Sequence, residues 1–121
     1  MAIDLVVLES IKGISEAVGA VASTCKEMST LANNKRSISS LMRNRLNMEL
    51  QIVEDAVRQH LAKQRQEALV ALLEDNIKAI KSTQDLINSL HLEGEAYIKA
   101  VQQLELLSRM LTRNVEFYYD Y

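Results

Sequence analysis

Apolar side chains recur along the chain at alternating spacings of four and three residues. In the first segment they are Val7, Ile11, Ile14, Val18, Val21, Cys25, Met28 and Ala32. This heptad pattern is typical of helices that pack side by side in a coiled coil or a bundle. The residues that flank this seam carry no charge, which favours a helix with neighbours on several sides. We therefore predict a helix over residues 3–33.

Three further segments have an apolar face at helical spacing, and we predict helices over residues 37–62, 66–91 and 95–119. Paired Asn33 and Asn34 suit a helix exit because Asn tolerates the left-handed conformation, and Ser37 or Asn34 suits the next N-cap. Gly94 marks the other clear turn. Nothing between residues 62 and 67 breaks a helix, so the middle two segments are either two helices or one continuous helix.

The pattern predicts an all-α fold: an antiparallel bundle of three or four long helices with coiled-coil-like packing, in a single domain over residues 1–121. The absence of Pro and the presence of three Gly in 121 residues agree with few, long helices. A continuous middle helix would bury its apolar faces poorly against two shorter partners. On that ground we expect self-association to complete the bundle.

The chain offers few residues for catalysis or metal binding. Neither of its two histidines, His60 and His91, follows a Glu by three positions, as di-iron bundles require. Cys25 is the single cysteine and lies on the apolar seam, so neither a zinc cluster nor an internal disulfide is expected. We predict no metal, no cofactor and no enzymatic activity. A small-ligand or catalytic site inside the bundle, lined by Cys25 and His60, is the second alternative.

A basic turn is the first candidate binding feature. It contains Lys35, Arg36, Arg43 and Arg45 and no acidic residue, although the whole chain has a net charge of −2. Such a cluster can bind nucleic acid or another polyanion, or it can pair with acidic side chains of its own bundle. No aromatic residue lies among these bases, which disfavours a surface that reads nucleotide bases.

An aromatic C-terminal tail, residues 117–121, is the second candidate. Four of the five aromatic residues of the chain lie there: Phe117, Tyr118, Tyr119 and Tyr121. Aromatic side chains are enriched at interfaces because they bury much area at little entropic cost. The tail therefore either docks a partner or a second copy, or closes one end of the bundle.

The leading functional hypothesis is a non-enzymatic helical module for protein–protein interaction or self-assembly, with a protein partner or a second copy bound through helical surfaces and the aromatic tail. Nucleic-acid or polyanion binding by the basic turn is the alternative. No apolar run is long enough to span a membrane. Acidic residues on the first helix disfavour contact with a membrane surface. The missing secretory signal and the single cysteine favour a cytoplasmic location.

Overall fold

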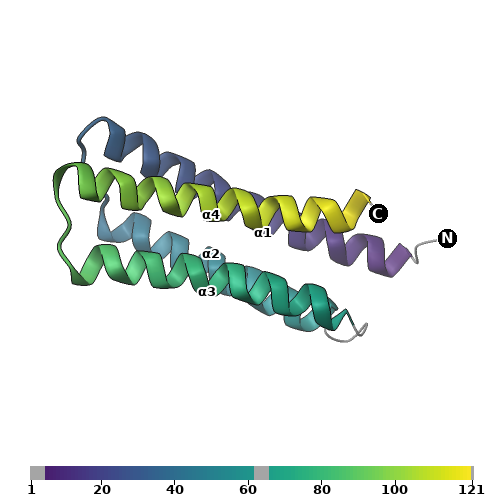
Figure 1. The fold of residues 1–121 in the computed structure, drawn as a ribbon. Helices are drawn as coiled ribbons and strands as arrows, with labels where there is room; N and C mark the ends of the chain where they lie inside the picture. The colour runs from purple at the N-terminus through teal and green to yellow at the C-terminus, as the bar shows by residue number, and fades with distance from the viewer. Residues whose placement is uncertain (1–4, 62–65, 121) are drawn as a thin grey trace.

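The computed structural model describes the backbone of residues 5–61 and 66–120 and the side chains of residues 12–61 and 66–117. Four α-helices run up and down in sequence order: α1 (Leu5–Asn33), α2 (Ser40–Ala56), α3 (Glu67–Ser89) and α4 (Gly94–Asp120). A π-helical turn, η1 (Val57–Leu61), extends α2. The described residues contain no strand. The predicted all-α antiparallel bundle is confirmed, with four helices (Figure 1).

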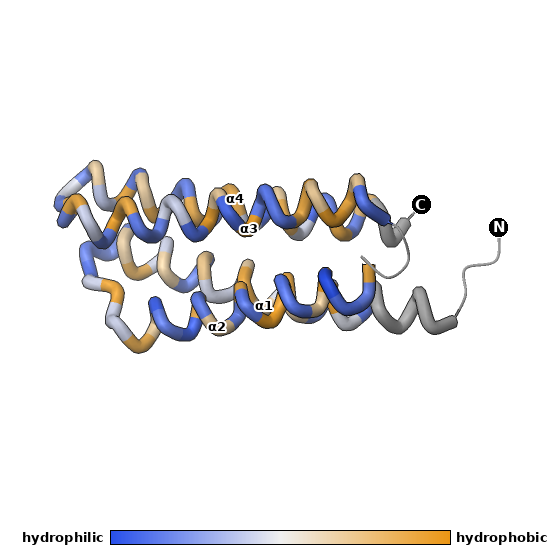
Figure 2. Tube along the Cα trace, turned by 90° about the horizontal axis from the view of Figure 1, so that it is seen from below, coloured by the Kyte–Doolittle hydropathy of each residue, from blue (hydrophilic) through white to orange (hydrophobic). Residues whose placement is uncertain are grey.

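The core is aliphatic and follows the heptad seams. On α1 the described seam residues are all buried: Ile14, Val18, Val21, Cys25, Met28 and Ala32. The residues that flank this seam are uncharged because α1 packs extensively against both α2 and α4. Thr24 on one flank and Ser29 on the other are themselves buried. Orange and blue residues alternate along each helix accordingly (Figure 2).

The π turn corrects the register of the second apolar seam. Leu46, Leu50, Val53 and Val57 follow spacings of four, three and four, and a strict heptad would next bury His60. A π turn holds one extra residue compared with an α turn. Leu61 is therefore buried in place of His60, which is half-buried.

The middle of the chain forms two helices, because η1 ends at Leu61 and α3 begins at Glu67. The backbone N–H of Gln66 donates to the carbonyl of Leu61 across this connection, at 3.2 Å. Residues 62–65 lie outside the described part of the chain. The expected self-association depended on one continuous middle helix, which this fold does not have. Any association must instead rest on exposed surface.

The connection between α1 and α2 differs from the prediction in two details. Lys35, rather than an Asn, adopts the left-handed conformation, with φ of 58°. Arg36 N donates to Leu31 O at 2.8 Å and Lys35 N to Ala32 O at 3.0 Å, which is the Schellman pattern. Ser39, rather than Ser37 or Asn34, caps α2 by accepting from Met42 N at 3.2 Å.

Replacement of Lys35 by Gly should stabilise the protein by about 1 kcal/mol, because the left-handed conformation costs an L-residue roughly that much. Lys26 is an exposed residue within α1 and is the matched control. Lys26→Gly should destabilise the protein by about 0.5–1 kcal/mol. Urea unfolding followed by circular dichroism measures both, and a destabilising Lys35→Gly would contradict the left-handed assignment.

Candidate functional site

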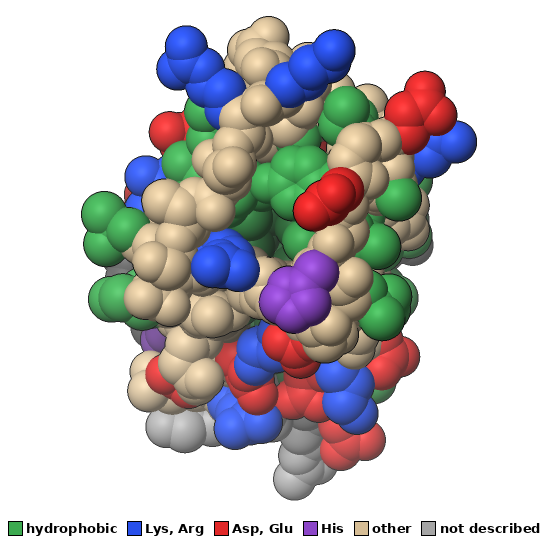
Figure 3. Space-filling view, turned by 90° about the vertical axis from the view of Figure 1, so that its left-hand side faces the viewer, with side chains coloured by type: hydrophobic (Ala, Val, Ile, Leu, Met, Phe, Trp, Pro, Cys, Tyr) green, Lys and Arg blue, Asp and Glu red, His purple; other side chains and the backbone are tan. Residues whose placement is uncertain are grey.

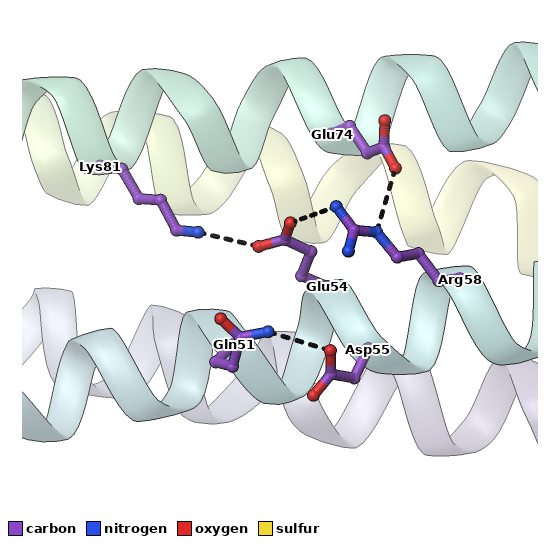
Figure 4. Close-up of polar contacts among 6 residues, drawn as sticks. All are labelled: Gln51, Glu54, Asp55, Arg58, Glu74 and Lys81. Carbon is purple, nitrogen blue, oxygen red and sulfur yellow. Dashed lines mark hydrogen bonds and ion pairs between the residues drawn. The ribbon is translucent and has the colours of Figure 1, made fainter.

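The side of the bundle between α2 and α3 is closed by polar side chains. The two helices make the least extensive contact of any adjacent pair. Four antiparallel pairs join them: Arg43 with Asn88, Asn47 with Gln84, Glu54 with Lys81, and Arg58 with Glu74. Two of these pairs are visible in Figure 4. Polar groups that already have partners make this side poorly suited to bind an apolar surface.

Glu54 is at the centre of this polar side. Its carboxylate accepts from Lys81 Nζ at 2.8 Å and from Arg58 at 2.7 Å, as Figure 4 shows. The hydrogen bond from Lys81 lowers the pKa of Glu54 below its ordinary value of 4.5, and the charges of Lys81 and Arg58 act in the same direction. The ionised carboxylate therefore stabilises the folded chain.

The structure does not assemble the predicted basic turn into one surface. Arg45 forms an ion pair with Glu27 of α1 at 2.6 Å, so it binds an acidic residue of its own bundle. Arg43 points to α3, where its guanidinium donates to Asn88 Oδ1 at 2.5 Å. Lys35 and Arg36 are exposed in the connection between α1 and α2. The four bases thus have three different surroundings.

Only the first residue of the predicted aromatic tail has a described side chain. Phe117 is 71% exposed near the C-terminal end of α4. The side chains of Tyr118, Tyr119 and Tyr121 lie outside the described residues. A role for these three tyrosines in binding stays a prediction.

Large apolar side chains are exposed along α3 and α4, at 44–71% of their surface. They are Leu72 and Leu86 on α3, Leu90 directly after the end of α3, and Leu106, Met110 and Phe117 on α4. We call this set the α3–α4 apolar face. Exposed apolar surface of this extent is a common mark of an interaction site.

The helical spacing places these residues over the groove between the two helices. Asn114 Nδ2 donates to Asn76 Oδ1 at 2.7 Å, which identifies the sides of α3 and α4 that face each other. Leu72 precedes Asn76 by four residues and Met110 precedes Asn114 by four, so each lies one turn away on the same side. Leu86 and Phe117 repeat these positions at intervals of fourteen and seven residues. The two rows therefore lie on the same side of the bundle.

A smaller apolar row lies on the outer side of α2. Leu41, Met48 and Ile52 are exposed there, and Arg45 stands between the first two. A shallow hollow of about 420 Å³ follows the N-terminal part of this row. One helix and three apolar residues offer less apolar surface than the α3–α4 apolar face.

Two hollows lie at the end of the bundle where the α1–α2 and α3–α4 connections meet, and they share Ile38 and Tyr97. Figure 3 looks onto this end, where hydrophobic side chains are visible between charged ones. The inner hollow measures about 120 Å³ and the outer about 640 Å³. Gln84 lines the inner hollow, and its Oε1 is buried without a hydrogen-bond partner. An unpaired buried acceptor lowers the free energy of unfolding by about 1–3 kcal/mol, so a hydrogen-bond donor bound at this atom would stabilise the fold.

The interior alternative built on Cys25 and His60 receives no support from these hollows, because neither residue lines them. Burial raises the pKa of the Cys25 thiol to about 12, which removes the thiolate that a nucleophile needs. Among the described residues, no three His, Cys, Asp or Glu side chains group in a way that could hold a metal ion. Within the same residues, no helix combines the length and apolar character needed to cross a membrane.

Comparison with protein-family models, with curated proteins and with solved structures finds no match to this chain. Sequence reasoning missed both the α3–α4 apolar face and Gln84. The apolar face had a sequence signal, because Leu72 and Leu86 are fourteen residues apart, which is two heptads, and Met110 and Phe117 are seven apart, outside the core seams.

Replacement of Glu54 by Gln should lower the free energy of unfolding by about 1 kcal/mol at pH 7. The substitution removes the charge from a partly buried carboxylate that accepts hydrogen bonds from both Lys81 and Arg58. A lowered folded pKa gives stability that is present above pH 4.5 and is lost as the pH falls through the folded value. The difference between wild type and Glu54→Gln should therefore shrink on acidification below pH 4.5.

Urea unfolding at pH 7 and at pH 3 to 4 measures this difference. Asp55→Asn is the control, since Asp55 is exposed and, among the described residues, accepts a side-chain hydrogen bond only from Gln51 of its own helix. A difference for Glu54→Gln that stays constant over this pH range would contradict the pairing.

The Cys25 thiol should be inert in the folded protein because it is fully buried and its pKa is raised to about 12. A thiol-specific chromogenic reagent should react with it only at the rate of unfolding, and at once in denaturant. Fast modification under native conditions would contradict the burial of α1 against α4.

Proposed function

We propose that this chain is a non-enzymatic self-association module, and that the α3–α4 apolar face binds the same face of a second copy. The single observation that carries the proposal is the set of six large apolar side chains exposed on one side of the bundle. The core of an interface between copies of a chain is typically depleted in charge and rich in such residues. Burial of this face would remove it from water, which is the dominant driving force of association.

Charges at the edges of this face favour a second copy as the partner. Asp75 is exposed next to Asn76 on α3, and Arg113 is exposed next to Asn114 on α4. The bond between the two asparagines sets Asp75 and Arg113 at the same height, on opposite edges of the face. Within the described part of the chain, neither of them forms an ion pair.

A two-fold axis parallel to the helices would lay α3 of one copy over α4 of the other. Each Asp75 would then stand opposite an Arg113, once on each side of the interface. A two-fold interface uses the same patch on both copies, so both pairs form together. The acidic edge on α3 and the basic edge on α4 thus make the face complementary to itself.

The apolar residues can be tested by one substitution at the middle of the face. Met110→Glu should raise the dissociation constant of the dimer at least about tenfold, because it brings a charge into the apolar contact. Met48→Glu on α2 is the matched control, since Met48 is also an exposed methionine on an outer helix face. Sedimentation equilibrium measures both, and equal effects at the two positions would contradict the assignment of the face.

The charged edges can be tested by reversal. Asp75→Arg should weaken the dimer, since it places two bases opposite each other, and Arg113→Asp should do the same. The double variant restores opposite charges and should recover most of the lost affinity. A wild-type chain that stays monomeric at tens of micromolar would contradict self-association altogether.

A further inference from the structure

We propose a second, independent site at the end of the bundle: the inner and outer hollows together bind a small 2-hydroxy carboxylic acid with an apolar chain. The hydroxyl would donate to Gln84, the carboxylate would bind Arg43, and the apolar chain would lie in the outer hollow. The site is distinct from the α3–α4 apolar face.

Gln84 sets the need for a hydrogen-bond donor. It is 3% exposed, and its Nε2 already donates to Asn47 Oδ1 at 2.5 Å. Its Oε1 is buried without a partner. A carboxylate alone offers only acceptors, so a ligand that completes this atom must carry an O–H or N–H group.

Arg43 sets the need for an anion. It lines the inner hollow and is half-buried, and its guanidinium donates a hydrogen bond to the neutral side chain of Asn88. Over the residues that the structure describes, Arg43 has no carboxylate partner. A guanidinium group binds a carboxylate through two parallel hydrogen bonds, which matches the head of the proposed ligand.

Tyr97 supplies a further donor at the boundary of the two hollows. Its hydroxyl accepts from the backbone N–H of Ile38 at 3.2 Å, which leaves its own proton for a ligand oxygen. Both Tyr97 and Ile38 line both hollows, so the two hollows adjoin each other at these side chains.

The sizes and charges of the hollows assign the two ends of the ligand. The inner hollow of about 120 Å³ has room for several waters, each of which takes about 30 Å³ in the liquid, and thus for a hydroxylated carboxylate head. The outer hollow has an apolar wall of Ile38, Leu92 and Ile98. Its bases, Lys35 and Arg36, are balanced by Glu93 and Glu95, so it does not favour an anion.

The test is a matched pair of ligands titrated calorimetrically into the full chain: 2-hydroxy-4-methylpentanoate and 4-methylpentanoate, which differ by the hydroxyl. The hydroxy acid should bind at least about tenfold more tightly, because the other compound leaves the buried acceptor unpaired. No binding at millimolar concentration, or equal binding of the two compounds, would overturn the proposal and leave a hollow filled by water.

Three variants locate the site. Gln84→Leu should abolish the preference for the hydroxy acid, and Arg43→Met should weaken both ligands about tenfold or more. Arg45→Met is the control: Arg45 is two residues away on the same helix, is paired with Glu27 and lines neither hollow of this site.

Circular dichroism verifies that each variant folds. If Arg43→Met does not fold, Arg43→Lys, which keeps the charge, replaces it in the titrations. In two-dimensional NMR spectra the side-chain amide of Gln84 should shift on addition of the hydroxy acid. Binding that shifts only residues elsewhere, or that Arg45→Met weakens as much as Arg43→Met, would overturn the assignment.

Discussion

The burial of α1 between α2 and α4 is the interaction on which the rest of the structure depends. Its seam residues from Ile14 to Ala32 are almost fully excluded from solvent, and each such aliphatic side chain contributes about 1.5–3 kcal/mol when buried. Because no charge flanks this seam, α1 can accept neighbours on both sides. Cys25 therefore behaves as a small core residue. The contacts of α2 and α4 with α1 determine which sides of these two helices face solvent.

The four sides of the bundle consequently differ in chemical character. Between α2 and α3, hydrogen bonds and ion pairs complete the contact, with Glu54 joined to both Lys81 and Arg58. Over α3 and α4, leucines, Met110 and Phe117 are exposed to solvent. This asymmetry assigns the two proposed roles to different places. The apolar side suits a second copy, and the loop end, with its unpaired Gln84 acceptor, suits a small ligand.

The heptad spacing was sufficient to predict the all-α bundle and the boundaries of its helices to within a few residues. It could not decide whether residues 37–91 form one helix, because no breaker lies between them; the π turn that buries Leu61 instead of His60 depends on tertiary packing. The predicted basic turn failed to appear as one patch because side-chain partners, such as Glu27 for Arg45, come from distant parts of the chain. Gln84 looked like any polar residue in sequence, since only the packed bundle shows that its oxygen is buried.

The most direct test of the central claim, that two chains meet through the α3–α4 apolar face, is an intermolecular distance between spin labels. Cysteines introduced at the exposed Gln103 on α4 or the exposed Ser23 on α1 can be labelled selectively if native Cys25 is inert. Pulsed dipolar spectroscopy at one protein concentration should give a defined short distance between labels at residue 103 and none between labels at residue 23. A short distance at residue 23, or no dipolar coupling at residue 103, would contradict the account.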